Sequence, residues 1–270
     1  MKPRVIAPSK ELIDKTLHII KNYNLNTVCY SSKCPNITEC FSRGVATFMI
    51  LGDKCTRNCR FCNVSSGTPQ NIDKNEPYNL SQAIKYLNLE YVVITSVDRD
   101  DLDDFGSGHF KDVIDTIYKE NNIKIEALTP DFNGDINALN KLTTSNVYKL
   151  AHNIETTKKL HHYLKPKSDY NLSLKVLEYY SKFKLTKSSI MIGFGESIKD
   201  IKNTFKDLLN SGVSQLTIGQ YLQPTPKHFE VKKYYSDEEF EELKAIALDM
   251  GFSAVVSGNL VRSSYYADKL

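Results

Sequence analysis

Residues 46–62 read Ala-Thr-Phe-Met-Ile-Leu-Gly-Asp-Lys-Cys-Thr-Arg-Asn-Cys-Arg-Phe-Cys. The first six are apolar or β-branched, which is typical of a buried strand, and Gly52 and Asp53 end the run. Three cysteines follow with the spacing C-x3-C-x2-C. Three closely spaced thiolates can hold three irons of a cubane and leave the fourth open, whereas a structural zinc site needs four ligands. The stretch therefore predicts a buried strand that leads into an iron–sulfur loop, with Cys55, Cys59 and Cys62 as ligands.

A second cysteine triplet precedes this loop. Cys29, Cys34 and Cys40 have the spacing C-x4-C-x5-C, and the two triplets account for all six cysteines of the chain. Two triplets predict two [4Fe–4S] clusters. The C-x-x-C pair of Cys59 and Cys62 also fits zinc or redox chemistry, but the neighbouring third thiol has no place in a simple zinc pair. Disulfides fit less well, because the spacings are tight and the chain shows no export signal.

The composition is that of a globular protein. Of the 270 residues 41% are hydrophobic and 25% charged, which is enough to bury a sizeable core. The net charge of +3 comes from scattered lysines rather than a basic run, so we expect no nucleic-acid partner. The chain contains no apolar stretch of about 18 residues that would span a membrane. Its first ten residues lack the apolar core of a secretory signal, so we expect a cytoplasmic protein without a membrane partner.

Strand-like and helix-like segments alternate along the chain. Six β-branched or apolar runs predict buried strands at Ala46–Leu51, Tyr91–Val97, Ile123–Leu128, Val147–Ala151, Ser189–Ile192 and Gln215–Ile218. Helical periodicity predicts helices at Leu80–Leu89, Phe110–Asn121, Ile136–Leu142, Leu172–Phe183, Ile198–Asn210 and Asp237–Met250. This alternation predicts an α/β fold with a parallel sheet and helices outside it.

Polar residues gather where the predicted strands end. Thr95, Ser96 and Asp98 close the second strand, and Asn153 and Glu155 follow the fourth. Further along, Gly193–Glu196 follows the fifth strand, and Gln220 and Tyr221 follow the sixth. In βα barrels the reacting groups lie at the C-terminal ends of the strands, so we expect these residues to face the barrel mouth. The glycines at 193 and 195 could approach a ligand through their backbone or could simply form a turn.

Two groups of residues have plainer interpretations. The aspartates between Asp98 and Asp104 are interrupted by Arg99, which predicts a solvated or salt-bridged turn rather than a metal site. His161 and His162 point to different faces of a helix and are expected at the surface.

The cysteine patterns belong to a longer series of matching motifs. The loop Cys55–Cys62, with an aromatic residue before its last cysteine, resembles the radical S-adenosylmethionine (SAM) superfamily. The whole chain from about residue 25 resembles the lipoyl synthases within it. The motifs that carry this resemblance are Thr27–Cys29, Lys33–Ile37, Glu39–Phe41, Ala46–Met49, Gly52–Asp53, Cys55–Arg57, Tyr91–Asp101, Leu128–Phe132, His152–Glu155, Leu216–Pro224, Ser257–Gly258 and Val261–Tyr265.

The resemblance implies a partial (β/α)6 barrel of TIM-like type. It places an N-terminal extension with the auxiliary-cluster cysteines at 1–45, the radical SAM barrel at 46–250 and a C-terminal segment at 251–270, in one compact domain. In this arrangement Cys55, Cys59 and Cys62 bind the cluster that chelates SAM. Thr95, Ser96, Asp98, Asn153 and Glu155 contact SAM or substrate.

The resemblance also implies how the auxiliary cluster is completed. Cys29, Cys34 and Cys40 would bind it together with a serine oxygen from the Arg-Ser-Ser-Tyr motif near the C-terminus. We expect Ser264 to be this ligand, with Ser263 as the adjacent alternative. Arg262 would hold the tail or contact the substrate peptide. The mismatch between an alkoxide and the softer thiolates suits a cluster that comes apart during turnover.

The implied activity is sulfur insertion, a sulfurtransferase reaction. Two SAM molecules would be cleaved to place sulfur at C6 and C8 of an octanoyl chain, with the auxiliary cluster as sulfur donor. The implied substrates are octanoylated lipoyl carrier domains, namely 2-oxoacid dehydrogenase E2 subunits and the glycine cleavage H protein. An electron donor such as flavodoxin or ferredoxin and cluster carrier proteins would serve the reaction. Alternatives are another radical SAM sulfur inserter, of the biotin synthase or methylthiotransferase type, and a non-catalytic metal-binding module.

Overall fold

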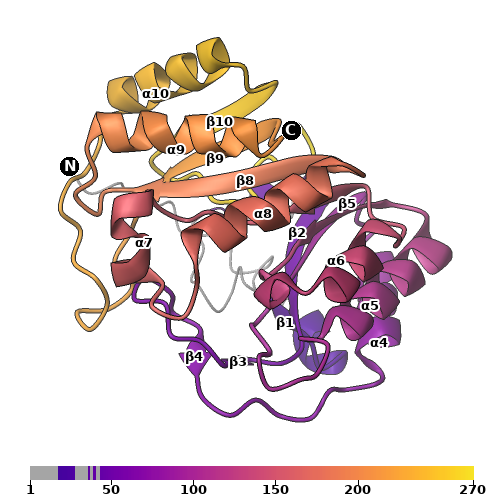
Figure 1. Cartoon of the computed structure of the whole chain (residues 1–270). Helices are drawn as coiled ribbons and strands as arrows, with labels where there is room; N and C mark the ends of the chain where they lie inside the picture. The colour runs from indigo at the N-terminus through magenta and orange to yellow at the C-terminus, as the bar shows by residue number, and fades with distance from the viewer. Residues whose placement is uncertain (1–17, 28–35, 37–38, 41–42) are drawn as a thin grey trace. The chain divides into compact units, whose positions relative to one another are not determined.

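The computed structural model describes residues 18–27, 36, 39–40 and 43–270, and Cys29 and Cys34 lie outside the described residues. The described chain forms two compact units (Figure 1). The N-terminal unit contains the described residues up to Arg57 together with Val64–Leu150. The C-terminal unit contains Asn58–Asn63 and Ala151–Leu270. The predicted iron–sulfur loop thus begins in one unit and ends in the other.

The N-terminal unit is a parallel sheet with one antiparallel edge strand. Its strands follow the order β1-β2-β5-β6-β7, with β1 antiparallel to β2 and with β2, β5 and β6 parallel. The register aligns Val45 with Tyr91 and Tyr91 with Lys124. The strands are β1 (Asn26–Thr27), β2 (Val45–Ile50), β5 (Tyr91–Ser96), β6 (Lys124–Leu128) and β7 (Lys149–Ala151), whose last residue is counted with the C-terminal unit.

The remaining elements of this unit are short or helical. A two-stranded parallel ladder joins β3 to β4, and helices follow β4, β5 and β6. Every residue of β2 is buried, as expected for a parallel strand covered on both faces. The elements are β3 (Lys54–Cys55), β4 (Ser65–Ser66), α4 (Glu76–Tyr86), α5 (Ser107–Asn121), the 3-10 helix η1 (Phe132–Gly134) and α6 (Ile136–Thr143).

The C-terminal unit repeats the strand–helix pattern. Strands β8 (Leu185–Ile192), β9 (Gln215–Gln220) and β10 (Ala254–Gly258) are parallel, and Gln215 aligns with both Lys187 and Ala254. The helices are α7 (Lys158–Leu164), α8 (Tyr170–Ser181), α9 (Ile198–Asn210) and α10 (Asp237–Met250). Capping boxes fix the starts of α9 and α10, because each N-cap serine and the acidic residue three positions later satisfy one another's backbone amides.

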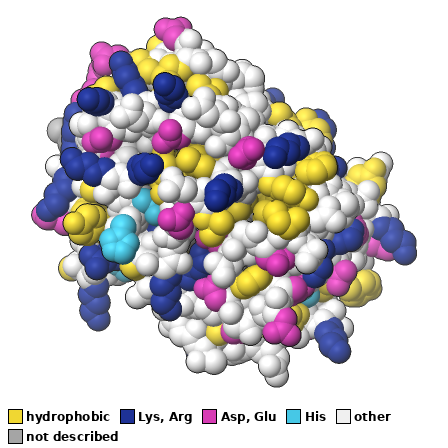
Figure 2. All heavy atoms as spheres, viewed as in Figure 1, with side chains coloured by type: hydrophobic (Ala, Val, Ile, Leu, Met, Phe, Trp, Pro, Cys, Tyr) yellow, Lys and Arg dark blue, Asp and Glu magenta, His cyan; other side chains and the backbone are white. Residues whose placement is uncertain are grey.

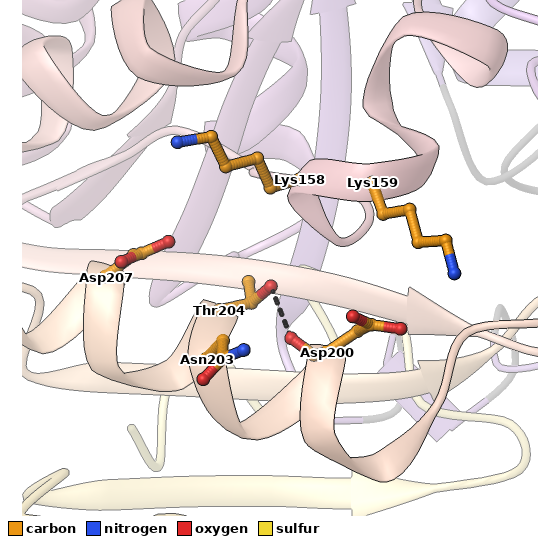
Figure 3. Close-up of a pocket in the computed structure, with 6 residues that line it drawn as sticks. All are labelled: Lys158, Lys159, Asp200, Asn203, Thr204 and Asp207. Carbon is orange, nitrogen blue, oxygen red and sulfur yellow. Dashed lines mark hydrogen bonds between the residues drawn. The ribbon is translucent and has the colours of Figure 1, made fainter.

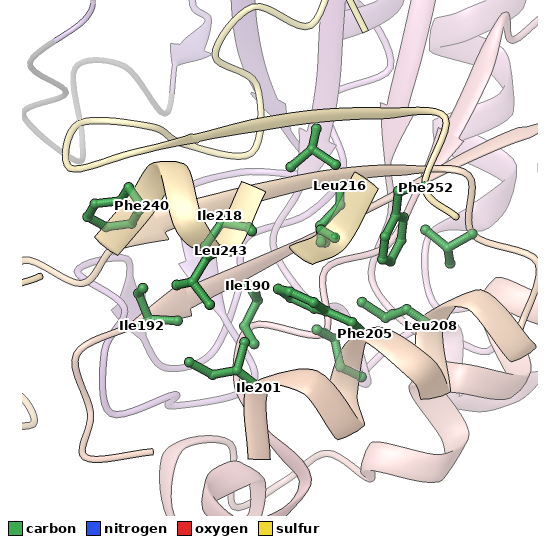
Figure 4. Close-up of a cluster of buried hydrophobic side chains, with 14 of the residues drawn as sticks. Ile190, Ile192, Ile201, Phe205, Leu208, Leu216, Ile218, Phe240, Leu243 and Phe252 are labelled. Atoms are coloured by element: carbon green, nitrogen blue, oxygen red, sulfur yellow. The ribbon is translucent and has the colours of Figure 1, made fainter. Parts of the chain in front are cut away.

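The core of this unit lies between the strands and helices α8, α9 and α10, and Figure 4 shows part of it. Ile190 and Ile218 come from neighbouring strands, and Phe205 of α9 packs between them and Phe252. Phe205 is fully buried, and its ring meets Phe252 edge-on at a centroid distance of 6.0 Å. Large side chains that interdigitate in this way hold the strand ends, and the loops that follow them, in fixed positions.

The expected alternation of strands and helices is confirmed, with shifted bounds. All six predicted strands and all six predicted helices are present, and α9 and α10 have the predicted bounds. The short α7 was not predicted, nor was β10, which lies within the segment assigned to the tail and pairs with β9. None of the helices in the described part of the chain is long and apolar enough to cross a membrane. Figure 2 shows basic and acidic side chains interspersed over the visible face.

Phe205→Ala should lower the free energy of unfolding by about 3–5 kcal/mol, because it leaves a cavity among fully buried side chains. Urea unfolding followed by circular dichroism measures this loss. Ile198→Ala on the same helix is the matched control, since Ile198 is exposed and its truncation should change stability by less than about 0.5 kcal/mol. Equal losses in the two variants would contradict the assigned core.

Candidate functional site

Cys55 stands at the end of β3 in the N-terminal unit and is half-buried. Its Sγ lies 3.6 Å from Oδ2 of Asp98, so the thiol can donate to this carboxylate. The backbone amide of Arg57 donates to the same sulfur over 3.4 Å. The carbonyl of Cys55 accepts from the amide of Gly67 at 3.0 Å, which closes the loop behind it. The sulfur therefore has two hydrogen-bond partners, the amide of Arg57 on the same loop and the carboxylate of Asp98 after β5.

Arg57 forms ion pairs with three aspartates of this unit. Its guanidinium is 6% exposed and donates two hydrogen bonds of 2.7 Å to Asp131, which is 1% exposed. Its Nε and Nη2 donate to the two carboxylate oxygens of Asp100 at 2.9 and 2.8 Å, and Nε lies 3.4 Å from Asp98. The paired hydrogen bonds to Asp131 and Asp100 use the planar fork of arginine, which lysine cannot reproduce.

This network sets the charge state of its members. Burial alone would lower the pKa of Arg57, but its hydrogen bonds to Asp100 and Asp131 and the charge of Asp98 outweigh it, so the net pKa is raised. The hydrogen bonds from Arg57 lower the pKa of Asp100, although burial opposes this shift. The guanidinium of Arg57 and the carboxylate of Asp100 therefore stay ionised at neutral pH. The prediction that the aspartates form a salt-bridged turn is confirmed, with Arg99 on Asp101 and Lys141 on Asp104 as further pairs.

The segment between β2 and Cys55 starts at a strained residue. Leu51 has a φ of +68°, which is uncommon for a residue other than glycine. Its amide donates to Glu76 at 3.0 Å, and its carbonyl accepts from Nη1 of Arg99 at 3.2 Å. Glu76 is held in turn by Nε2 of His109 at 2.6 Å. These supporting residues were not predicted, because their role depends on partners 25 and 48 positions away in the sequence.

Thr95 and Ser96 end β5 and are half-buried, and Asp98 follows two residues later. Of the residues predicted to contact SAM, Asp98 is the one that the structure places against a predicted cluster ligand within this unit. Asn153 and Glu155 belong to the other unit, and their predicted contact with SAM stays a prediction.

Glu155 has an unusual conformation and charge environment. Its φ is +68°, and its backbone pairs with β8 through the amide of Met191 and the carbonyl of Ser189, at 2.9 and 3.0 Å. Burial raises the pKa of its carboxyl, while Lys165 and a 3.0 Å hydrogen bond from Asn153 act in the opposite direction. Strained, half-buried ionisable groups of this kind are concentrated at functional sites.

Cys59 and Cys62 form a tight turn in the C-terminal unit. The amide of Cys62 donates to the carbonyl of Cys59 at 3.1 Å, and both residues are half-buried. Phe61, between them, packs against the ring of Phe194 with a centroid distance of 6.2 Å. The aromatic position of the motif thus anchors the turn in an apolar cluster that includes Leu164 and Tyr221.

The residues Gly193–Glu196 form a closed turn. The amides of Gly193 and Phe194 donate to the two carboxylate oxygens of Glu196 at 2.6 and 2.9 Å, and Tyr235 donates to the same carboxylate at 3.1 Å. These two amides are therefore engaged within the turn, and of the two interpretations of the glycines the turn is the one that the structure supports. Glu196 was not predicted as the partner of this turn.

The C-terminal segment is fastened to the end of β9. Nη1 of Arg262 donates to the carbonyls of Val261 and Gln220 at 2.7 and 3.4 Å, so its side chain holds the tail. A Cβ at Gly219 would lie 2.3 Å from the carbonyl oxygen of Val261, so only glycine allows this approach. Ser263 and Ser264 are both half-buried, and the choice between them as cluster ligand stays a prediction.

Among residues 18–27, 36, 39–40 and 43–270, no three His, Cys, Asp or Glu side chains are grouped closely enough to hold a metal ion. What fits an iron–sulfur cluster is the donor set itself, three half-buried thiols spaced on one short loop. Cys40 is described and half-buried, and its amide donates to Asn36 at 3.0 Å. Its partners in the first triplet, Cys29 and Cys34, are outside the described residues.

A cleft of about 340 Å³ lies between α7 and α9 (Figure 3). It is lined by Lys158, Lys159, Asp200, Asn203, Thr204 and Asp207, none of which is a predicted site residue. Nearby, His161 is 2% exposed and meets Tyr170 edge-on at 5.6 Å, so the expectation that it lies at the surface was wrong. The other histidine of the pair, His162, is exposed as expected. The unpredicted helix α7 packs one face against α8 and α9, which buries His161.

Comparison with known proteins gives consistent results. The family described as the radical SAM superfamily matches residues 49–208. The lipoyl synthase of Caldicellulosiruptor saccharolyticus is 45% identical, over 98% of this chain and 95% of its own. The lipoyl synthase of Wigglesworthia glossinidia brevipalpis is 49% identical, over 95% of this chain and 83% of its own.

Solved structures share the fold at low sequence identity. Streptococcus suis SuiB bound to S-adenosylmethionine has a TM-score of 0.60 at 14% identity, over 81% of this chain and 53% of that chain. Methylornithine synthase (PylB) has a TM-score of 0.56 at 14% identity, over 98% of this chain and 84% of that chain. These similarities confirm the α/β fold with a mostly parallel sheet.

Asp100→Asn should reduce stability at neutral pH and not in acid. The hydrogen bonds from Arg57 lower the folded-state pKa of Asp100 below its ordinary value of 3.8, so its contribution is complete above that pH. The contribution is lost as the pH falls through 3.8 towards the folded-state value. Urea unfolding from pH 7 to pH 3 should show a constant difference between wild type and variant down to about pH 5 that shrinks below about pH 4. Asp53→Asn, at an exposed position, controls for the charge change, and a difference independent of pH would contradict the assignment.

Gly219→Ala should loosen the C-terminal segment, because the added Cβ collides with the backbone of Val261. Trypsin should then cleave after Arg262 several-fold faster than in the wild type. Gly258→Ala is the matched control, since its Cβ would meet only a methyl group of Val261, at 3.3 Å. Equal cleavage rates in all three proteins would show that the close approach does not hold the tail.

Proposed function

Because the chain belongs to the lipoyl synthase family of the radical SAM superfamily, we propose that it inserts two sulfur atoms, at C6 and C8, into an octanoyl chain attached to a lysine of lipoyl carrier domains. The observation that carries this proposal is the match to lipoyl synthases over 98% of the chain, together with the two cysteine triplets. The product is the protein-bound lipoyl group. The cluster held by the first triplet is the sulfur donor and is consumed as a substrate.

The superfamily uses SAM and a [4Fe–4S] cluster, and Cys55, Cys59 and Cys62 would hold this cluster. When bound, it supplies the electron that cleaves SAM to a 5′-deoxyadenosyl radical, which can break the unactivated C–H bonds of an alkyl chain. Acid–base catalysis cannot break such bonds at useful rates, so the protein's task is to position groups and exclude water.

Several of the described residues are placed to position Cys55 or to contact SAM. Asp98 and Arg57 fix Cys55, the first cluster ligand, from the end of β5. Glu155, oriented by Asn153, offers a carboxylate for the amino group of SAM. Thr95 and Ser96 offer hydroxyl groups at the end of β5. These contacts with SAM are proposals based on position and chemistry.

The auxiliary cluster would be held by Cys29, Cys34, Cys40 and Ser264. Arg262 donates to the carbonyl of Val261 in the tail and to that of Gln220 at the end of β9, which gives it a positioning role next to the two candidate serines. A serine oxygen binds iron less well than a thiolate does, which suits a cluster that must release sulfide.

The partners follow from this chemistry. They are octanoylated carrier domains, namely 2-oxoacid dehydrogenase E2 subunits and the glycine cleavage H protein, with flavodoxin or ferredoxin as electron donor and cluster carrier proteins for resupply. The proposed location is the cytoplasm, where thiols and clusters stay reduced. The interspersed charges of Figure 2 give no support for a nucleic-acid site on the visible face.

Single cysteine variants test the division of labour between the triplets. Cys55→Ser should abolish SAM cleavage, whereas Cys34→Ser should still cleave SAM but leave the octanoyl peptide without sulfur. Replacing the whole first triplet by alanine should lower the iron content from about eight to about four per chain. Mass spectrometry of the peptide, 5′-deoxyadenosine assay and iron counting measure these effects, with Ser65→Ala at an exposed position as control.

Each alternative function has its own signature in this experiment. Lipoyl formation by the Cys34 variant would sink the two-cluster mechanism. Zinc in place of iron, with no SAM cleavage, would identify a non-catalytic metal-binding module. Sulfur transfer to a substrate other than the octanoyl peptide would identify a sulfur inserter of the biotin synthase or methylthiotransferase type.

A further inference from the structure

Three residues of the C-terminal unit, all far from the turn Cys59–Cys62 in the sequence, form hydrogen bonds with it. The amide of Arg60 donates to the carbonyl of Leu164 at 2.8 Å, and its carbonyl accepts from the amide of Phe229 at 2.9 Å. Nε2 of His228 lies 3.0 Å from the carbonyl oxygen of Cys62. The last of these contacts is the only side-chain contact among the three, and it reaches a predicted cluster ligand directly.

Apolar packing holds the segment that carries His228 in place. Phe229 meets Phe194 edge-on at 5.8 Å, and Phe194 stacks on Tyr221 at 4.3 Å. The hydroxyl of Tyr221 donates to the carbonyl of Phe229 at 2.7 Å. Because Phe61 of the turn packs on the same Phe194 ring, the turn and the segment share one apolar support.

The contacts of the imidazole place a requirement on Nε2. A carbonyl oxygen only accepts hydrogen bonds, so Nε2 must carry a hydrogen to bind Cys62. Nδ1 lies 2.8 Å from Oγ1 of Thr225, and this oxygen already accepts from the amide of Lys227 at 3.3 Å. The hydroxyl hydrogen is then available to Nδ1. Hydrogen on Nε2 satisfies the contact with Cys62, and the hydroxyl group of Thr225 can satisfy Nδ1.

We propose that His228, oriented by Thr225, is a positioning residue that donates from Nε2 to the carbonyl of Cys62 and so fixes the turn for cluster binding. The inference deepens the proposed function and rests on it, since Cys62 is a ligand only if that function holds. His228 touches the backbone of Cys62 and leaves the thiol to the iron. A turn fixed before the metal arrives loses less conformational entropy on binding.

The tautomer is the first test, and it needs no cluster. Long-range ¹H–¹⁵N correlation spectra of the full chain with labelled histidine distinguish the two ring nitrogens, and His228→Gln assigns the signal. The proposal requires hydrogen on Nε2 of His228, and a Thr225→Val variant should lose this preference while Thr225→Ser keeps it. An Nε2 without hydrogen in the wild type would overturn the proposal.

Variants of both residues test the consequence for the turn. His228→Ala should speed hydrogen exchange at the amide of Cys62 in the metal-free chain by about tenfold, a change of about 1.4 kcal/mol. In the reconstituted chain, His228→Ala should lose iron to a chelator faster and change the electron paramagnetic resonance spectrum of the reduced cluster with SAM. His228→Gln, whose amide can still donate, should restore both properties. Thr225→Val should behave like His228→Ala. Thr225→Ser should behave like His228→Gln.

The two proposals fail in different ways. A wild-type chain that binds no iron and does not cleave SAM would contradict the proposed function, whichever tautomer His228 has. A wild-type chain that binds iron and SAM, with exchange and spectra unchanged in His228→Ala, would overturn the role of His228 alone.

Discussion

The N-terminal half of the cysteine loop depends on one buried charge. Arg57 lies within the motif Cys55–Cys62 and is 6% exposed, so its guanidinium must find carboxylates inside the protein. Asp131 and Asp100 supply them with paired hydrogen bonds, and Asp98, third in the network, also accepts from the thiol of Cys55. Removing the buried partner Asp131 would typically cost about 3–5 kcal/mol, and removing the more exposed Asp100 would cost less. The network therefore ties Cys55, the first predicted ligand, to the loops after β5 and β6.

The other half of the loop is held by a different kind of interaction. Cys59 and Cys62 lie in a turn whose backbone is paired with Leu164 and Phe229 and whose aromatic residue is buried against Phe194. Ion pairs support the residues around Cys55, whereas apolar packing and backbone hydrogen bonds support the turn Cys59–Cys62. In both cases the predicted ligands are supported by residues whose own positions are fixed by strands and helices, which is what a precisely held site requires.

Much of the fold was predictable from local signals. The capping boxes at Ser197 and Ser236 set the bounds of α9 and α10. The seven-residue α7 was too short for its periodicity to be distinguished, and β10 is only five residues long. His161 was misplaced because its burial depends on the packing of that helix.

The sequence predicts a set of cluster ligands for the candidate site, and it does not predict the residues that support them. The cysteine spacing alone indicated the cluster loop, because three thiolates at short intervals suit few other purposes. The network of Arg57 could not be read from the sequence, since its partners lie 43 and 74 positions away. The same holds for His228, which contacts a residue 166 positions before it.

The most direct measurement follows the sulfur atoms. The chain would be reconstituted with heavy-isotope sulfide, freed of excess sulfide, and mixed with SAM, a reductant and an octanoyl-lysyl peptide from a lipoyl carrier domain for a single turnover. We predict a peptide that gains two heavy sulfur atoms with no net loss of hydrogen, as the dithiol expected in the presence of reductant, and that loses two hydrogens only on later oxidation to the disulfide, with two 5′-deoxyadenosines formed. A peptide that gains no sulfur, or gains only light sulfur, would contradict the proposal that this chain is a lipoyl synthase that consumes its own auxiliary cluster.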